Sequence, residues 1–356
     1  MNYRIGYIGF GTMAGGYHYD SAVREDVPFT ATAVFDLREE QRALAESRGL
    51  RAFDNLKDFL DSRLFDLVVV ATPNQYHCEM TCAALEAGYH VMCEKPVAMN
   101  VSELEKMIAT SKRVGKMFTV HHNRRWDKDT LMLKQALDTG KLGKLITLEN
   151  RIHFKDGSGM MFGWRMYEDH GGGLFGDWGI HMLDQLLYII DEPIRSVWGK
   201  IMPIRSGEVD DYSKVIITFE SGLTAQVEAA GFSPIALPKW YAVGDCGAVV
   251  IPNTKCEGAM MRCIGKMEQS VIKTEVYPDN RVDTREYDKY LVTEWEEIPL
   301  PITPIPQDWA ALYKNVAAAL DGKEQLVVTP ESVLRCFRVL EAAKKSSETG
   351  LAVEFW

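Results

Sequence analysis

The first third of the chain alternates short apolar runs with amphipathic stretches of helical period. The apolar runs fall at residues 3–10, 29–36, 65–72, 90–94 and 116–121. A run such as Leu-Val-Val-Val has no polar face, so both faces of its strand are expected to be buried. Helices on both sides of a parallel sheet satisfy that requirement. The alternation therefore predicts a doubly wound α/β domain over residues 1–122.

The pattern changes after about residue 122. One amphipathic helix is expected over 127–143, and strands then dominate, at 144–154, 194–204, 213–219, 223–231 and 240–251. Strands joined by short turns form antiparallel or mixed sheets. Residues 278–300 are charged and weakly patterned, which indicates a surface excursion. Thr329 and Pro330 mark the start of a last helix. A second, α+β domain over 123–356 is expected.

Composition limits the partners of the chain. Its 356 residues hold 40 Lys and Arg against 50 Asp and Glu, a net charge of −10. This balance argues against nucleic acid or an anionic membrane as a partner. No apolar run approaches the roughly 20 residues of a membrane span, and the N-terminus enters a strand directly. A cytoplasmic protein is expected.

The cysteines also favour a cytoplasmic protein. Seven of them are scattered, mostly in apolar contexts, which favours free thiols in a reducing compartment. Cys78 and Cys82 lie four residues apart, but no second pair follows at zinc spacing. No metal site is predicted.

A glycine-rich turn follows the first strand. Gly9, Gly11 and Ala14 form a G-x-G-x-x-A array between a strand and a helix. The first glycine permits the tight turn, the second lets a pyrophosphate approach the backbone, and the small third residue keeps helix and strand close. The turn therefore predicts a dinucleotide site, with contacts from Gly9, Phe10, Gly11, Thr12 and Met13.

An acidic residue supports this interpretation. Asp36 ends the second strand, where a carboxylate accepts the ribose hydroxyls of NAD and repels the 2′-phosphate of NADP. NAD is therefore favoured over NADP, although Arg38, two residues on, is a residue type that binds that phosphate. The alternative is a glycine turn with no ligand and Asp36 as a helix cap.

Polar residues leave two neighbouring strands at their carboxyl ends, where open parallel sheets bind ligands. One group is Glu94 and Lys95, held by Pro96. The other comprises Thr72, Pro73, Asn74 and His77. We expect both groups to contact the cofactor, with Lys95 near the nicotinamide. The alternative is a surface salt bridge at Glu94 and a proline that merely ends a strand.

A second cluster follows three glycines at 171–173. Asp177 and His181 lie four residues apart and so share a helix face, with Asp184 three further on. The rest of this helix is apolar, so the polar residues at its start are suited to line an active site. The alternative has Asp177 as a helix cap and His181 as a buried structural histidine.

Together these motifs resemble one family. The segments "GFGTMA", "ATPNQYH", "CEKP", "NRRWD" and "GGGLFGDWGIH", in this order, are similar to the glucose–fructose oxidoreductase/inositol dehydrogenase family, Gfo/Idh/MocA. The resemblance covers nearly the whole chain. It implies a Rossmann domain and a C-terminal domain with an open, mostly antiparallel mixed sheet that often mediates oligomer contacts. A homo-oligomer, dimer or tetramer, is expected.

The resemblance also implies site residues. Lys95, Asp177 and His181 match the catalytic positions of the family and would contact the substrate. Trp164 and Arg165 match a pair near the cofactor, and Arg124 and His153 match substrate contacts in some members. Residues 253–300 have no informative pattern, so they do not identify the substrate.

These residues lead to a mechanism. We expect hydride transfer between a secondary hydroxyl of a sugar, sugar derivative or cyclitol and NAD, with His181 as base and Lys95 stabilising the alkoxide. Asp177 would orient a hydroxyl or tune the other two side chains. Two alternatives stay open. One is NAD-dependent glycoside cleavage through transient oxidation, and the other is a non-enzymatic sugar or nucleotide sensor.

Overall fold

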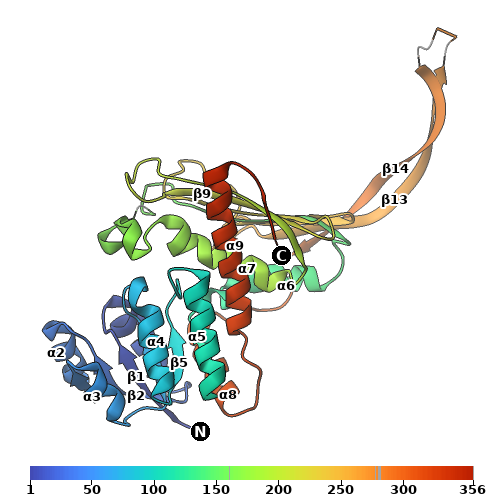
Figure 1. The fold of residues 1–356 in the computed structure, drawn as a ribbon. Helices are drawn as coiled ribbons and strands as arrows, with labels where there is room; N and C mark the ends of the chain where they lie inside the picture. Colours follow the sequence, from blue (N-terminus) through green and yellow to red (C-terminus); the bar gives the residue numbers. More distant parts are fainter. Residues whose placement is uncertain (160, 277, 280–281, 356) are drawn as a thin grey trace.

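The computed structural model describes residues 1–159, 161–276, 278–279 and 282–355. Within them, the N-terminal strands form one parallel sheet (Figure 1). Its order is β3 (Arg51–Phe53), β2 (Phe29–Phe35), β1 (Tyr3–Ile8), β4 (Leu67–Val70), β5 (His90–Cys93) and β6 (Phe118–Val120). This 3-2-1-4-5-6 order is that of a dinucleotide-binding doubly wound fold. The sequence prediction is confirmed.

Helices cover the sheet as the periodicity predicts. They are α1 (Tyr19–Ala22), α2 (Glu39–Ser47), α3 (Leu56–Asp61), α4 (His77–Glu86) and α5 (Val101–Val114). The Asn100 side chain caps α5 by accepting a hydrogen bond from the Glu103 amide at 2.9 Å. Gly115 ends that helix with φ +66°, a backbone conformation that glycine adopts without strain. Local chemistry therefore fixes both ends of α5.

The second sheet is mixed. Its order is β14 (Val282–Pro299), β13 (Met260–Val276), β12 (Gly247–Ile251), β11 (Trp240–Gly244), β7 (Leu145–His153), β10 (Thr224–Ala230), β9 (Tyr212–Phe219), β8 (Ile194–Met202) and β15 (Val353–Glu354). Among the described strands of this second sheet, only β7 and β10 pair in parallel. The mostly antiparallel mixed sheet that we predicted is confirmed.

Two details of this sheet differ from the prediction. Residues 240–251 form a hairpin, β11 and β12, rather than one strand, because the chain reverses at Asp245 and Cys246. The excursion over 278–300 belongs to two long paired strands, β13 and β14. Beyond Cys263 the side chains of β13 up to Val271 are half-buried or exposed, so no buried face imposes a period of two on this part of the hairpin.

The helices in the described part of the chain pack on one face of the mixed sheet. They are α6 (Lys128–Asp138), α7 (Ile180–Ile189) and α9 (Pro330–Thr349), which lie between this sheet and the N-terminal domain (Figure 1). From β7, Asn150 turns inward and donates to the Met182 carbonyl of α7 at 3.3 Å. From β11, Trp240 donates to Asp129 of α6 at 3.0 Å. The residues between these inward positions face the other side, which no described helix covers.

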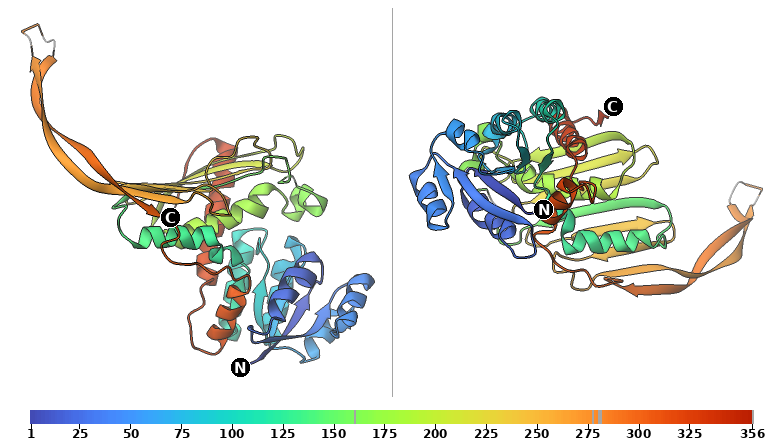
Figure 2. Two further views of the ribbon diagram at one scale, coloured as in Figure 1. Left: turned by 180° about the vertical axis from the view of Figure 1, so that it is seen from behind. Right: turned by 90° about the horizontal axis from the view of Figure 1, so that it is seen from below.

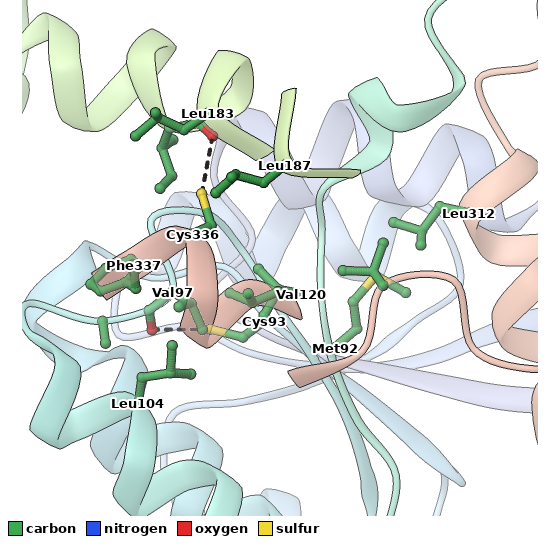
Figure 3. Close-up of a cluster of buried hydrophobic side chains, with 14 of the residues drawn as sticks. Met92, Cys93, Val97, Leu104, Val120, Leu183, Leu187, Leu312, Cys336 and Phe337 are labelled. Carbon is green, nitrogen blue, oxygen red and sulfur yellow. Dashed lines mark hydrogen bonds between the residues drawn. The ribbon is translucent and has the colours of Figure 1, made fainter. Parts of the chain in front are cut away.

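The C-terminal helices return to the first domain, as two further views show (Figure 2). They are α8 (Ala311–Leu320) and α9, which begins after a Thr329 side chain that caps it, as predicted. Figure 3 shows the core that results, where Cys336 and Phe337 of α9 lie near Leu183 of α7 and Cys93 of β5. Because the chain returns in this way, the domain boundary at residue 122 stays a prediction.

The described cysteines are all free, and six are buried while Cys246 is exposed. No helix in the described part of the chain combines the length and apolar composition that crossing a bilayer requires.

Candidate active site

The glycine turn after β1 has the geometry of a dinucleotide loop. Gly9 has φ +84°, and a Cβ there would lie 2.7 Å from the Ala71 carbonyl oxygen, so only glycine fits. The Phe10 amide donates to Asp36 at 2.8 Å, while the Phe10 ring is buried. Thr12 is exposed and Met13 half-buried where the helical turn η1 (Met13–His18) begins. A direct hydrogen bond therefore joins the glycine turn to Asp36, the residue that follows β2.

Asp36 is held as a carboxylate. Burial would raise its pKa, but the Arg38 guanidinium and the amides of Phe10 and Arg38 bring that pKa below its ordinary value. The Arg38 side chain is half exposed and folds onto Asp36 at 3.2 Å. The positive charge of Arg38 is therefore paired with the Asp36 carboxylate in this structure.

The loop after β4 lies beside the glycine turn and carries an unpartnered polar group. The Thr72 hydroxyl is buried with no hydrogen-bond partner among the described residues, and its methyl is 3.3 Å from a Cβ built on Gly9. A buried hydroxyl of this kind needs a partner. A bound dinucleotide at the turn would supply one, so the residues present fit the cofactor.

Other residues of this loop form hydrogen bonds to neighbouring segments of the chain. Asn74 is buried and donates to the Gly171 carbonyl of the second domain at 3.3 Å, whereas Pro73 is exposed. His77 is buried, and its ring nitrogens lie 2.8 Å from the carbonyl oxygens of Pro96 and Thr72. It ties the β4 loop to the β5 loop. A direct contact of His77 with the cofactor stays a prediction.

Lys95 and Asp177 form the centre of the site. The Lys95 ammonium donates to the Asp177 carboxylate at 2.7 Å and to its main-chain carbonyl at 3.0 Å. Arg165 approaches the same carboxylate at 3.4 Å and lies over the Trp164 ring. Burial would raise the pKa of Asp177, but Lys95 and Arg165 hold it below its ordinary value. The two halves of the chain thus meet at one ion pair.

His181 lies one turn beyond Asp177. It is buried at the start of α7, and its Nδ1 has no hydrogen-bond partner among the described residues. Burial lowers the pKa of His181 well below its ordinary value, and the charges of Lys95 and Arg124 lower it further. A neutral imidazole with a free nitrogen is able to accept a proton.

Glu94 sits in a buried network. One carboxylate oxygen accepts from His18 at 2.7 Å and contacts His121 at 2.8 Å, and the other accepts from the Lys95 amide at 2.8 Å. His18 also contacts the Tyr313 hydroxyl of α8 at 2.5 Å. These side chains are of metal-ligand type, but their separations are those of hydrogen bonds. The network fixes the backbone from which Lys95 emerges.

The structure separates the two remaining predicted substrate contacts. The Arg124 guanidinium lies 4.6 Å over the ring of Trp178. Because Trp178 stands between Asp177 and His181 in the sequence, Arg124 is close to the site. His153 lies on the face of β7 that carries Glu149 and Arg151, and it accepts a hydrogen bond from the Leu237 amide at 3.2 Å. That face points away from α7, so His153 is not brought to the other candidates.

Two buried groups near the site escaped the sequence analysis. His122 lies 6.1 Å from His181 between ring centres, and burial lowers the pKa of His122 to about 4. Lys239 is buried and donates to Asn150 at 2.6 Å. Their sequence signal is weak, because one is a histidine after a strand and the other begins a strand. Asp184, placed in the polar stripe of the helix, instead pairs with Arg125.

Comparison with known proteins agrees with this geometry. Residues 3–122 match the model of an oxidoreductase family with an NAD-binding Rossmann fold, and residues 130–250 match the GFO/IDH/MocA C-terminal domain. The chain belongs to the Gfo/Idh/MocA oxidoreductase family. The resemblance seen in the sequence is therefore confirmed, and the N-terminal domain of this family member is a Rossmann domain.

Relatives extend the match over the whole chain. The uncharacterised oxidoreductase YdgJ of Escherichia coli K12 is 31% identical over 352 residues, 98% of this chain and 97% of the relative. The scyllo-inositol 2-dehydrogenase (NADP(+)) IolW of Bacillus subtilis is 24% identical over 97% of this chain and 94% of its own length. The crystal structure of an NAD-binding protein from Listeria innocua superposes with a TM-score of 0.82, at 32% identity and with 99% and 97% coverage. This Gfo/Idh/MocA protein is an enzyme of a dehydrogenase family.

Proposed function

We propose that this enzyme transfers hydride between a secondary hydroxyl of a sugar, sugar derivative or cyclitol and a nicotinamide cofactor. The observation that carries the proposal is the Lys95–Asp177 ion pair, with His181 one helical turn beyond Asp177 and its Nδ1 without a hydrogen-bond partner among the described residues. A polyol-type substrate is supported by the relative that is named a scyllo-inositol dehydrogenase.

The ammonium of Lys95 would stabilise the reacting oxygen. Two of its three N–H groups are directed to Asp177, which leaves a third for a substrate hydroxyl. At about 4 Å and an effective dielectric near 20, attraction between an ammonium and a developing alkoxide is about 4 kcal/mol before screening. Asp177 acts by positioning this lysine.

His181 would take the hydroxyl proton. Its pKa lies well below the ordinary value, so the imidazole is neutral over the physiological range and accepts a proton from the alcohol. A positioned base of this kind contributes about 10²–10⁴-fold to a rate. Accepting hydride is the chemistry that a bound nicotinamide supplies.

The cofactor would be held by the glycine turn, Asp36, the β4 loop and the Trp164–Arg165 pair. NAD is favoured because the Asp36 carboxylate faces the turn through the Phe10 amide, and an anion there repels a 2′-phosphate. A relative that uses NADP(+) and the neighbouring Arg38 leave NADP as the alternative.

A second candidate function is NAD-dependent glycoside cleavage, in which oxidation is transient. The same three side chains would serve it, so the geometry alone does not separate the two reactions. A sensor without catalysis is disfavoured because it needs neither the Lys95–Asp177 ion pair nor a free base at His181.

The test is a screen for NADH formation at 340 nm over inositols, aldoses, deoxysugars, sugar phosphates and aryl glycosides, with NAD and NADP in parallel. Net reduced cofactor with a polyol or sugar supports the proposal. Aglycone release with no net NADH assigns the glycosidase chemistry instead. Cofactor binding without turnover on any compound contradicts both.

A further inference from the structure

A second ion pair lies beside the proposed base and takes no part in the proposed chemistry. The Arg124 guanidinium donates to the Asp127 carboxylate at 3.0 Å. The same guanidinium lies 4.6 Å over the ring of Trp178, and the centre of that ring is 6.2 Å from the ring centre of His181. One aromatic side chain therefore separates the Arg124–Asp127 pair from His181.

Arg124 is close enough to His181 to act on it electrostatically. Burial lowers the pKa of His181, and the positive charges of Lys95 and Arg124 lower it further. The Arg124 side chain is 28% exposed and the Asp127 side chain 18%, so neither is sealed in the core. A sugar ring is about as wide as the indole ring between His181 and Arg124. When one hydroxyl contacts His181, other substituents of the sugar would therefore reach the Arg124–Asp127 pair.

The usual role of an aspartate at this position does not explain how Asp127 is oriented. Asp127 precedes α6 as its N-cap residue, where a carboxylate commonly accepts a hydrogen bond from an amide of the first turn. Asn100 and Thr329 make that bond at the starts of α5 and α9. The Asp127 side chain makes no capping bond among the described residues, and it faces Arg124 instead. Its orientation therefore follows from the arginine and not from the helix.

The other two cations at the centre are paired in the same way. Lys95 and Arg165 both contact the Asp177 carboxylate, at 2.7 and 3.4 Å. A carboxylate beside a cation cancels most of the attraction that this cation exerts on an anion farther out. A phosphate or carboxylate group on a substrate would also be repelled by Asp127 and Asp177. A site selects between substrates by such repulsion as well as by attraction.

A hydroxyl group, in contrast, fits the Arg124–Asp127 pair. Arg124 has five N–H donors, and the hydrogen bond to Asp127 uses one of them. On the Asp127 carboxylate this bond uses Oδ2, and an ionised carboxylate has further acceptor positions. A donor and an acceptor therefore stand side by side. A hydroxyl both accepts and donates, so one or two neighbouring hydroxyls of a polyol satisfy both groups.

We infer that the enzyme acts on an uncharged sugar or cyclitol, and that Asp127 excludes phosphorylated and acidic sugars by neutralising Arg124. The inference rests on the proposed function, since it concerns the substrate of the same site. Without the aspartate, Arg124 would present an unpaired guanidinium, a group that binds phosphate or carboxylate with two parallel hydrogen bonds. Asp127 is thus a specificity-determining residue and Arg124 is the group on which it acts.

Matched compounds test the inference on the unaltered enzyme. The pairs are an inositol and its monophosphate, glucose and glucose 6-phosphate, and methyl glucoside and methyl glucuronide. We expect kcat/KM to be about tenfold or more higher for the uncharged member of any pair that is turned over. Binding of the same compounds to the cofactor-loaded enzyme, measured by the rise in its melting temperature, should show the same preference.

Two substitutions on one segment of the chain provide the matched variants. Asp127→Asn keeps the shape of the side chain and removes its charge, so the ratio of kcat/KM for the charged to the uncharged compound should rise about tenfold or more. Asp138→Asn makes the same change at the exposed end of α6, where Asp138 pairs with Lys134, and should leave the ratio unchanged. Circular dichroism and NADH binding establish that both variants fold.

Other outcomes overturn the inference. One is a preference of the unaltered enzyme for the phosphorylated or acidic compound, in turnover or in binding. Another is an Asp127→Asn variant that folds and keeps the original ratio. Failure of the proposed function is distinct from both, because uncharged compounds would then bind better than charged ones and none would be oxidised.

Discussion

The ammonium of Lys95 reaches both the carboxylate and the main-chain carbonyl of Asp177, at 2.7 and 3.0 Å. One side chain therefore joins the carboxyl end of β5 to the turn that opens α7. The Glu94 network fixes the backbone on one side of this contact. The arrangement leaves a proton donor and the neutral base His181 in one place.

The first prediction concerns Lys95→Met. This change keeps the length of the side chain and removes its charge, so stabilisation of the reacting oxygen is lost. We expect kcat to fall about 10²–10³-fold, as when one such donor is removed from other enzymes, with cofactor affinity nearly unchanged. Steady-state kinetics on a substrate found by the screen and fluorescence titration with NADH measure the two effects. Lys57→Met, at an 82% exposed side chain on α3, is the control and should leave both unchanged.

The second prediction concerns the choice between cofactors. Asp36→Asn removes the negative charge and frees the Arg38 guanidinium that now pairs with it. We expect the ratio of kcat/KM for NADP to that for NAD to rise by about tenfold or more, equivalent to about 1.4 kcal/mol. Asp54→Asn, at an exposed acid just beyond β3, should not move this ratio. An unchanged ratio in Asp36→Asn would show that the acid does not face the ribose.

A structural feature could be predicted from the sequence where it depends on residues that are close together in the chain. The glycine turn, Asn100, Thr329 and the strand runs are short-range features, and each has the role that its chemistry predicts. The structure does not bring His153 to Lys95 and His181, because strand alternation, which the family motif does not encode, turns it to the far face of β7. The pairing of β13 with β14 was missed because most of their described side chains beyond Cys263 are exposed, so no buried face imposes a period of two on the sequence.

The Glu94 network illustrates another limit. Its members, His18, Glu94, His121 and Tyr313, come from four separate elements, and only the folded sheet brings them together. No spacing in the sequence signals such a cluster. The pairing of Lys95 with Asp177 is equally distant in sequence, but there both residues lie in recognisable motifs.

The third prediction concerns stability in acid. Burial lowers the pKa of four fully buried histidines below 6.5, namely His18, His77, His122 and His181. The unfolded chain then binds more protons than the folded one below pH 6.5, so stability falls as the pH drops through that value. Each such histidine contributes up to about 1.4 kcal/mol per pH unit between 6.5 and its folded pKa, which for His122 is about 4.

Glu94 adds to this loss at lower pH. Burial would raise its pKa, but His121 and His18 hold that pKa well below 4.5, so its contribution is present above 4.5 and lost as the pH falls below it. Melting temperatures from pH 8 to pH 4 should therefore decline from about pH 6.5. A flat profile down to pH 5 would mean that the buried histidines are not neutral in the folded protein.

The last prediction concerns the ion pair between Arg125 and Asp184. Both side chains are at most 3% exposed, and the guanidinium donates to the carboxylate at 2.6 and 2.9 Å and also contacts Ser332 at the start of α9. Asp184→Ala leaves a buried arginine without its counter-ion, which costs about 3–5 kcal/mol. Chemical denaturation measures this loss.

An exposed ion pair between α5 and α9 is the control. Glu105 of α5 pairs with Arg338 of α9 at 2.9 Å, with both side chains about half exposed. Glu105→Ala should cost at most about 1 kcal/mol, because water already solvates both charges. Arg125→Met combined with Asp184→Leu should recover part of the stability lost in Asp184→Ala, since no buried charge then remains unpaired. If the single change costs no more than Glu105→Ala, water reaches Arg125 and this ion pair does not behave as a buried one.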